Sequence, residues 1–372
     1  MPAKILLFFH LRKYFLHISK KSSTFAPNIE QTMLCSNLNT ALSDLLAQYE
    51  REQVCVVADQ AVTSNEVWQK TFAGLPVLSL EIDEAHKSLD LVQRIWDFFF
   101  AQGLTRRGVA VCVGGGVLTD IAGFAASTYK RGIRYITIPT TLLAMVDASS
   151  GGKTGINYHG LKNSIGAFAA PEATLICPAW LQTLPAKETL SGFGEMLKTG
   201  LIDGSGLWEA MLQYDLDKMD IEPLTPLIDA CVRVKKSVVA KDPKEDGPRK
   251  VLNLGHTFGH ALEEVSLVER PILHGYAVVY GLIAELYLSV VKLGCPKEPL
   301  QQLTQLMLHY YGKPKCKCSD RERLITLMQA DKKNERTADI NCTLLKAVGS
   351  PVINQVITPD EANEALDYLF SL

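Results

Sequence analysis

Histidines and a glutamate in the second half of the sequence could bind one divalent metal ion. His256 and His260 are four residues apart and share one face if their segment is helical, with Asn253 about one turn earlier. Glu195 and His274 add a carboxylate and a third imidazole. These are usual zinc ligands, and three of them would leave a fourth position open for substrate hydroxyls. Spacing alone does not decide which two histidines bind, and an isolated pair of this spacing is more often structural.

A run of glycines, Gly114, Gly115 and Gly116, could bind a nucleotide. It follows the apolar segment Val109–Val113 and precedes a segment of helical character. A buried strand that ends in glycines and opens a helix lets the backbone approach a pyrophosphate, where free N–H groups and the helix dipole favour anions. Thr119 stands where the third glycine of the dinucleotide fingerprint would fall, so an ordinary tight turn is the alternative.

A second candidate strand, Tyr135–Ile138, ends in a polar loop that contains Thr140 and Thr141. Dinucleotides bind in a crevice at the carboxyl ends of parallel strands, so two neighbouring strands that both end in such loops predict this crevice better than one strand does. Three charged residues could reach the adenosine end of the ligand, although each alone is better explained as a solvated surface charge: Asp59, Glu84 and Lys87. A metal site, a nucleotide site and the lysines between them indicate an enzyme that acts on a phosphorylated polyol.

The composition is that of an ordinary globular protein. The chain has 372 residues, of which 47% are hydrophobic and 21% charged, and this length suggests two domains. With 38 Lys and Arg against 40 Asp and Glu, the net charge of −2 gives no basic field, so we expect no nucleic-acid partner. The nine scattered cysteines are odd in number and indicate a reducing, cytoplasmic location.

The N-terminus resembles a targeting peptide only superficially. Residues 1–29 contain no acidic side chain, and their apolar run Ile5–Phe9 is too short to span a bilayer. No other segment approaches the length of a membrane helix, so we expect no membrane partner. We expect residues 1–32 to be a disordered or artefactual extension, with Met33 as the natural start.

Short β-branched runs alternate with amphipathic segments as far as residue 178, which predicts an α/β domain with a parallel sheet. The expected strands are Val54–Val57, Pro76–Ile82, Gly108–Val113, Arg134–Ile138 and Ala173–Ile176, with a helix at Leu89–Phe100. After Pro178 strand candidates nearly vanish. The expected helical segments there are 190–200, 224–241, 250–266, 275–293, 297–310 and 359–371. We therefore predict domains at 33–178 and 179–372.

Six ordered motifs together resemble the 3-dehydroquinate synthase family. They are Gly114–Asp120, Ile138–Asp147, Gly151–Asn157, Lys162–Gly166, Gly194–Lys198 and Asn253–His260. The resemblance runs from about residue 50 to the end of the chain. It implies a Rossmann-like domain that binds NAD, a mainly α-helical domain that binds zinc or cobalt, an active site in the cleft between them, and a homodimer.

The resemblance also assigns roles to single residues. The metal ligands would be Glu195, His256 and His274, although Tyr276 departs from the family pattern close to His274. The residues implied in catalysis are Asp147, Lys153, Lys198, Lys235, Asn253 and His260. Those implied in substrate binding are Arg131, Asn163, Arg249 and one of Lys332 and Lys333. Those expected at NAD are Asp59, Glu84, Lys87, Gly114, Gly115, Gly116, Asp120, Thr140, Thr141 and Lys162.

The implied reaction is the conversion of 3-deoxy-D-arabino-heptulosonate 7-phosphate to 3-dehydroquinate and phosphate in the shikimate pathway. Transient oxidation by NAD, phosphate elimination, re-reduction and an intramolecular aldol closure would follow one another in one site. A substrate with a carboxylate, a phosphate and hydroxyls explains the many cations. The alternatives are another sugar-phosphate cyclase, a metal-dependent polyol dehydrogenase, and a pseudoenzyme that senses NAD or metal.

Overall fold

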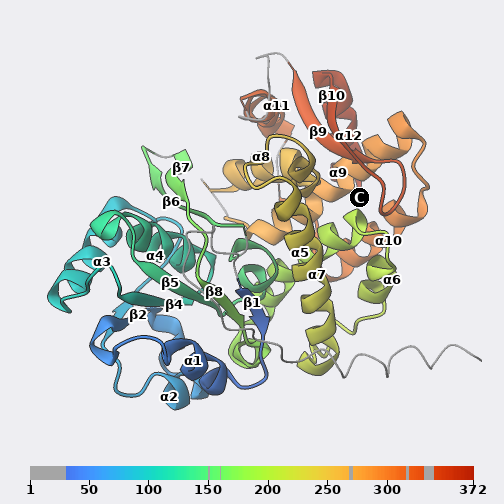
Figure 1. The fold of residues 1–372 in the computed structure, drawn as a ribbon. Coiled ribbons are helices and arrows are strands. Elements are labelled where there is room, and N and C mark those ends of the chain that lie inside the picture. Colours follow the sequence, from blue (N-terminus) through green and yellow to red (C-terminus); the bar gives the residue numbers. More distant parts are fainter. Residues whose placement is uncertain (1–30, 150, 160, 268–270, 316–317, 331–338) are drawn as a thin grey trace, which may run out of the picture.

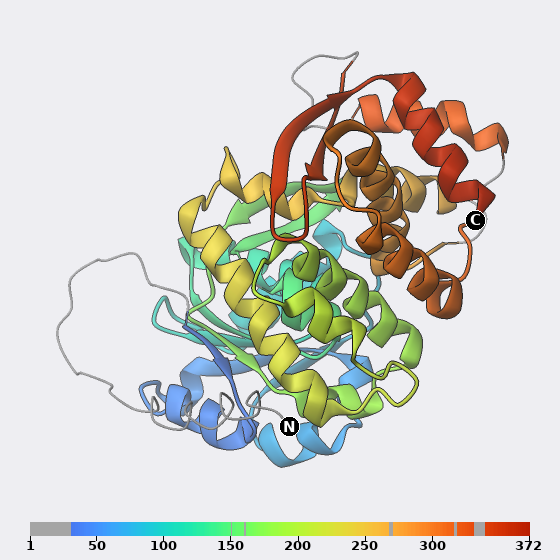
Figure 2. The same cartoon turned by 90° about the vertical axis from the view of Figure 1, so that its right-hand side faces the viewer.

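The computed structural model describes residues 31–149, 151–159, 161–267, 271–315, 318–330 and 339–372 (Figure 1). Residues 1–30 of the expected extension lie outside this range. In both views the large sheet lies at one end of the molecule and the C-terminal elements at the other (Figures 1 and 2).

The first half contains a six-stranded parallel sheet with strand order β1-β8-β5-β4-β2-β3. The strands are β1 (Gln31–Leu34), β2 (Val54–Asp59), β3 (Val77–Leu80), β4 (Val109–Gly114), β5 (Arg134–Pro139) and β8 (Ala173–Ile176). The five expected strands are confirmed. Strand β1 was not expected, and its residues Gln31 and Thr32 pair with Ala173 and Thr174. Residues Gln31 and Thr32 therefore belong to the sheet and not to an extension.

Helices cover both faces of the sheet, which explains why its central strands are apolar throughout. Val54 and Val56 face a core that continues into the second half of the chain, whereas Cys55 and Val57 face the other side. The helices of this half are α1 (Leu38–Leu46), α2 (Glu66–Thr71), α3 (Leu89–Ala101) and α4 (Gly116–Thr128). The expected α/β class is confirmed.

The second half is mainly helical, as expected. Its helices are α5 (Ala186–Ile202), α6 (Leu207–Leu212), α7 (Ile221–Lys241), α8 (His256–Ser266), α9 (His274–Leu293), α10 (Glu298–Leu306), α11 (Arg321–Gln329) and α12 (Pro359–Ser371). Helix α8 begins later than expected, because Pro248–Asn253 form a 3₁₀ turn and Gly255 adopts φ +80°. The domain division near Pro178, just after β8, stays a prediction.

Two antiparallel hairpins were not expected. Strands β6 (Lys153–Tyr158) and β7 (Leu161–Phe168) pair with Gly155 opposite Gly166, and glycine and lysine are depleted in strands. Strands β9 (Ile340–Leu345) and β10 (Pro351–Ile357) correct the prediction that strands nearly vanish after Pro178. An irregularity between Val352 and Gln355 breaks the alternation of β10 that would have marked it as a strand.

Helix α9 corrects the expectation that no segment approaches the length of a membrane helix. It has 20 residues, and its most apolar window has a mean hydropathy of 1.5. In this structure 67% of that window is buried inside the protein. The core helix of a globular protein has the same composition, so length and hydropathy are weak evidence for a membrane span.

Glycines let α9 approach α5 and α8 closely. A Cβ atom on Gly275 would overlap the carbonyl oxygen of Ser191 in α5, and one on Gly194 would overlap the carbonyl oxygen of Gly275. Further along α9, a Cβ atom on Gly281 would overlap the carbonyl oxygen of Gly255, at the start of α8. The three helices therefore pack backbone against backbone at positions next to the sequence-predicted metal ligands.

Replacing Gly281 by alanine tests this packing. In an exposed helix the change would stabilise by roughly 0.5–1 kcal/mol. Here the overlap with Gly255 should instead lower the free energy of unfolding by about 1–3 kcal/mol, the usual cost of overpacking. Urea unfolding measures the difference. Gly204→Ala is the control, because its Cβ atom would meet nothing closer than 3.5 Å. A Gly281→Ala protein as stable as the wild type would contradict the close approach.

Candidate metal centre and the ion-pair network around it

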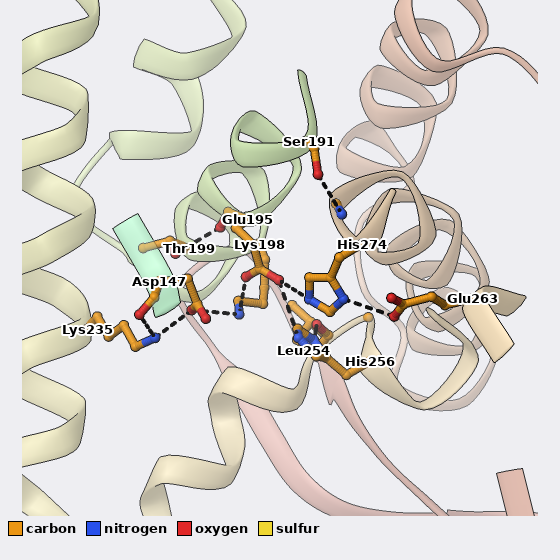
Figure 3. A network of polar contacts seen from close by, with 12 residues as sticks. Asp147, Ser191, Glu195, Lys198, Thr199, Lys235, Leu254, His256, Glu263 and His274 are labelled. Carbon is orange, nitrogen blue, oxygen red and sulfur yellow. Dashed lines mark hydrogen bonds and ion pairs between the residues drawn. The ribbon is translucent and has the colours of Figure 1, made fainter. Parts of the chain in front are cut away.

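Glu195, His256 and His274 come from three helices and meet at one point (Figure 3). Glu195 Oε1 lies 3.3 Å from His256 Nε2 and 3.1 Å from His274 Nε2. The Glu195 side chain is only 1% exposed. A buried carboxylate thus faces two imidazole nitrogens, which is the arrangement that a metal site needs.

The backbone around the two histidines fixes their positions. Each is the first residue of its helix, and His256 follows the left-handed Gly255. Glu285 of α9, which is fully buried, accepts hydrogen bonds from the backbone N–H groups of Gly255 at 2.6 Å and Thr257 at 3.1 Å. It thus caps the start of α8 from the neighbouring helix. Sequence analysis missed Glu285, although an acidic residue inside an apolar helix was a signal.

The charges around Glu195 keep it ionised. Burial alone would raise the pKa of Glu195, but Lys198, His256 and His274 hold it well below its ordinary value. Burial and the charge of Lys198 lower the pKa of His256, which favours the neutral ring that a metal ligand needs. Burial would lower the pKa of His274, but Glu195 and Glu263 raise it to about 10. A metal ion would displace this proton.

Asp147 continues the network toward the first half of the chain. It lies in the π-helical turn η4 (Ala144–Ala148), and its Oδ1 is 2.7 Å from Lys235 Nζ and 3.6 Å from Lys198 Nζ. Lys198 also contacts Glu195. Burial would raise the pKa of Asp147, but the two lysines lower it. Burial lowers the pKa of Lys235, whereas Glu195 and Asp147 outweigh burial at Lys198 and raise its pKa.

The donor set fits a tetrahedral ion. Two ligand atoms about 2.0–2.1 Å from such an ion lie roughly 3.4 Å apart, close to the 3.1 and 3.3 Å found between Glu195 and the histidines. Glu195 Oε2 is buried and accepts no aligned hydrogen bond, although Lys198 contacts it. One carboxylate and two imidazoles are suitable ligands for zinc or cobalt.

His260 is an alternative third imidazole. Ligand nitrogens of His256, His260 and His274 lie within 4.8 Å of one another, and the ring centroids of His256 and His260 are 5.0 Å apart. His260 is exposed, however, whereas Glu195 is buried between the other two histidines. The geometry favours Glu195 over His260 as the third ligand.

Glu245 gathers the cationic and amide side chains expected at the substrate. It forms an ion pair with Lys153 and accepts a hydrogen bond from Asn253 at 2.9 Å. Arg249 is buried nearby and donates to the carbonyl oxygen of Pro243 at 2.7 Å. Sequence analysis missed Glu245, which carries no motif signal of its own.

Glu263 of α8 bridges the metal centre and the β6–β7 hairpin. Its Oε2 lies 3.1 Å from His274 Nδ1, and its Oε1 lies 2.8 Å from Lys162 Nζ. Burial would raise the pKa of Glu263, but these two partners lower it. Lys162 was expected to bind the cofactor, whereas this structure directs it toward the metal centre. Glu263 itself was missed.

The two expected strand ends meet at one edge of the sheet. Gly114 ends β4, Gly116 begins α4, and the backbone N–H of Thr140 donates to the carbonyl oxygen of Gly114 at 3.0 Å. Cβ atoms on Gly115 and Gly116 would lie 3.2 Å from Thr141 Cγ2 and 2.9 Å from Ala148 Cβ, respectively. Asp59, which ends the neighbouring strand β2, lies beside Gly114. The glycines let these segments approach one another, because a Cβ atom at each of them would press against a neighbouring side chain.

The alternative explanation of Lys87 as a solvated surface charge was wrong. Lys87 is 3% exposed, so it is no solvated surface charge, and its Nζ lies 2.6 Å from both Asp120 Oδ2 and Asn163 Oδ1. Asp120 lies in the first turns of α4, close to the glycines. Glu84 accepts a hydrogen bond from Asn157 at 2.9 Å.

Arg131 follows the end of α4 that is opposite to the glycine run. It is exposed in the turn after α4, just before β5 begins. The 13 residues of α4 separate this turn from Gly116 by about 20 Å. The prediction that Arg131 reaches the phosphate stays a prediction. Lys332 and Lys333 lie outside the described residues.

Comparisons with known proteins agree with this geometry. The model of the 3-dehydroquinate synthase N-terminal domain matches residues 77–191, and that of the C-terminal domain matches residues 192–334. The chain belongs to the 3-dehydroquinate synthase family. A family member from Parabacteroides distasonis is 41% identical over 345 residues, which cover 91% of this chain and 97% of that protein.

Solved structures of related cyclases share the fold. A 2-epi-5-epi-valiolone synthase from Streptomyces hygroscopicus, with NAD⁺ and Zn²⁺ bound, has a TM-score of 0.80 and 26% identity, covering 95% of this chain and 99% of that one. A 2-deoxy-scyllo-inosose synthase complexed with carbaglucose-6-phosphate, NAD⁺ and Co²⁺ has a TM-score of 0.77 and 23% identity, covering 90% and 95%. The second likeness concerns the fold alone.

Proposed function

We propose that this protein is a carbon–oxygen lyase that converts 3-deoxy-D-arabino-heptulosonate 7-phosphate to 3-dehydroquinate and phosphate. One observation carries the proposal: the turn Ala144–Ala148 joins the two halves of the site. Ala148 lies beside Gly116 at the nucleotide loop, and Asp147 contacts Lys198, which contacts the metal ligand Glu195. A cofactor at the glycines and a metal at the histidines would therefore lie on either side of one substrate.

Glu195, His256 and His274 would hold zinc or cobalt, and the glycine loop with Thr140, Thr141 and Asp59 would hold NAD. When bound, the metal acidifies a substrate hydroxyl, and NAD accepts a hydride and later returns it. The donor set and the glycine contacts support these assignments.

The chain's own residues would bind and orient a charged substrate. Lys153, Arg249 and Asn253 cluster around Glu245. Each hydrogen bond from Lys153 or Arg249 to a substrate anion would contribute roughly 1.5–3 kcal/mol. Lys235 and Lys198 hold Asp147 ionised beside the metal ligands, where it can accept a hydrogen bond from a substrate hydroxyl. Asn163 would help to orient the phosphate. His260 lies one turn after His256, and its ring centroid is 5.0 Å from that of His256, beside the proposed metal site.

A metal-dependent polyol dehydrogenase and another sugar-phosphate cyclase are the alternatives. The likeness to 2-epi-5-epi-valiolone synthase supports the alternative of another sugar-phosphate cyclase. A panel of sugar phosphates, assayed for phosphate release, distinguishes the cyclases from one another.

Replacing His256 by alanine tests the metal assignment. Loss of one imidazole from a three-ligand site should reduce bound zinc from about one ion per chain to near zero, while NAD binding stays intact. Metal analysis after dialysis against zinc measures the bound zinc. The fluorescence of the reduced cofactor, titrated into the protein, measures nucleotide binding. His260→Ala is the matched control and should keep its zinc. The reverse result, with zinc lost only from His260→Ala, would refute the assignment of Glu195, His256 and His274.

The stoichiometry of NAD tests the reaction. If oxidation is undone within one turnover, NAD far below the substrate concentration should support complete conversion, with one phosphate released per substrate. Absorbance of reduced nicotinamide and a phosphate assay follow the two quantities together. A dehydrogenase would instead accumulate reduced cofactor in step with substrate loss and release no phosphate, and that outcome would overturn the proposed function.

We also propose a cytoplasmic homodimer. The seven cysteines whose side chains the structure describes are free thiols, which supports a reducing location. The β6–β7 hairpin exposes apolar side chains that a second copy could cover: Tyr158 is 49%, Leu161 66% and Phe168 63% exposed.

Light scattering tests the dimer. The wild type should have twice the mass of one chain, and Leu161→Asp with Phe168→Asp should shift it toward the monomer. Phe100 is 77% exposed on α3 and provides the control, since Phe100→Asp should leave the dimer intact. A wild type that is monomeric at micromolar concentration would exclude the homodimer.

A further inference from the structure

The two carboxylate oxygens of Glu263 contact different partners. It lies seven residues after His256 on α8, so both side chains occupy the same face of that helix. Its Oε2 contacts His274 Nδ1 at 3.1 Å, and its Oε1 contacts Lys162 Nζ at 2.8 Å (Figure 3 shows the first contact). The side chain is only 14% exposed, so solvent screens these contacts weakly.

The contact with Glu263 determines which nitrogen of His274 can bind a metal. An ionised carboxylate can only accept, so Nδ1 must carry the hydrogen that it donates. The proton that a metal would displace is then the one on Nε2, which lies 3.1 Å from Glu195 Oε1. His256 has the same arrangement, but its Nδ1 faces the backbone carbonyl oxygen of Leu254 at 3.1 Å. One histidine is therefore held by the fixed backbone and the other by a movable side chain.

Lys162 connects this side chain to the nucleotide half of the site. Lys162 and Asn163 are neighbours on β7, where the pairing with β6 shifts register and Asn163 adopts φ +50°. Lys162 contacts Glu263 on α8, whereas Asn163 accepts a hydrogen bond from Lys87, which pairs with Asp120 on α4. The hairpin is thus linked to α4 by Asn163 through Lys87, and to the metal centre by Lys162 through Glu263.

We propose that Glu263 is a positioning residue for His274, and that its ion pair with Lys162 makes the orientation of His274 depend on the docked β6–β7 hairpin. The inference rests on the proposed metal site, and it adds to that site a carboxylate that no ligand assignment includes. Partners of this kind fix the tautomer and ring orientation of a metal-binding histidine.

The experiment measures zinc affinity by competition with a chromogenic chelator for the wild type, Glu263→Ala, Glu263→Gln and Lys162→Met. Glu263→Ala should weaken zinc binding roughly 10- to 100-fold, the usual effect of removing such a partner. Glu263→Gln retains an acceptor oxygen and should recover part of the loss, and Lys162→Met should produce a smaller loss. The matched control is Glu264→Ala on the same helix, which should bind zinc as the wild type does.

The visible absorption of the cobalt-loaded proteins provides a second measurement. It would not change if Glu263 only stabilised the fold. The Glu263→Ala spectrum should differ from that of the wild type, because a ligand ring has changed its orientation. Tight zinc binding by the wild type with unchanged affinity and spectrum in Glu263→Ala would overturn this inference alone. Absence of zinc binding by the wild type would overturn the proposed metal site and this inference with it.

Discussion

The close packing of helices α5, α8 and α9 at glycines is the constraint on which the site depends. Each proposed metal ligand is the direct neighbour of one of these glycines: Gly194 precedes Glu195, Gly255 precedes His256, and Gly275 follows His274. A larger side chain at any of them would overlap a backbone atom or, at Gly255, the side chain of Leu282. This close packing brings the side chains of Glu195, His256 and His274 to one point.

An alternating series of charges extends from this packed centre in both directions. Lys235, Asp147, Lys198 and Glu195 follow one another on one side, and His274, Glu263 and Lys162 on the other. Each buried charge is compensated by the next, which reduces the desolvation penalty that an isolated charge would incur. The network therefore joins the nucleotide half to the metal half through side chains as well as through the backbone.

The sequence predicted the parts of this structure that have a local or periodic signal. Apolar runs such as Val109–Val113 predicted the strands, and the proximity of Gly114 and Thr141 followed because neighbouring parallel strands end at one edge. Contacts between distant segments leave no such signal. Glu245 and Glu263 were missed for this reason, whereas Glu285 carried a signal, an acidic residue inside an apolar helix, that was not used. The glycine-rich β6–β7 hairpin contradicts strand propensities and was not among the expected strands.

The central claim is that three helices packed at glycines build one metal site on a nucleotide-binding scaffold. Anomalous X-ray scattering at the zinc edge, from crystals grown with zinc and NAD, tests it most directly. The account predicts one peak between Glu195, His256 and His274, with ligand distances of about 2.0–2.2 Å. A peak coordinated by other residues, or no peak in this position at full zinc occupancy in solution, would contradict it.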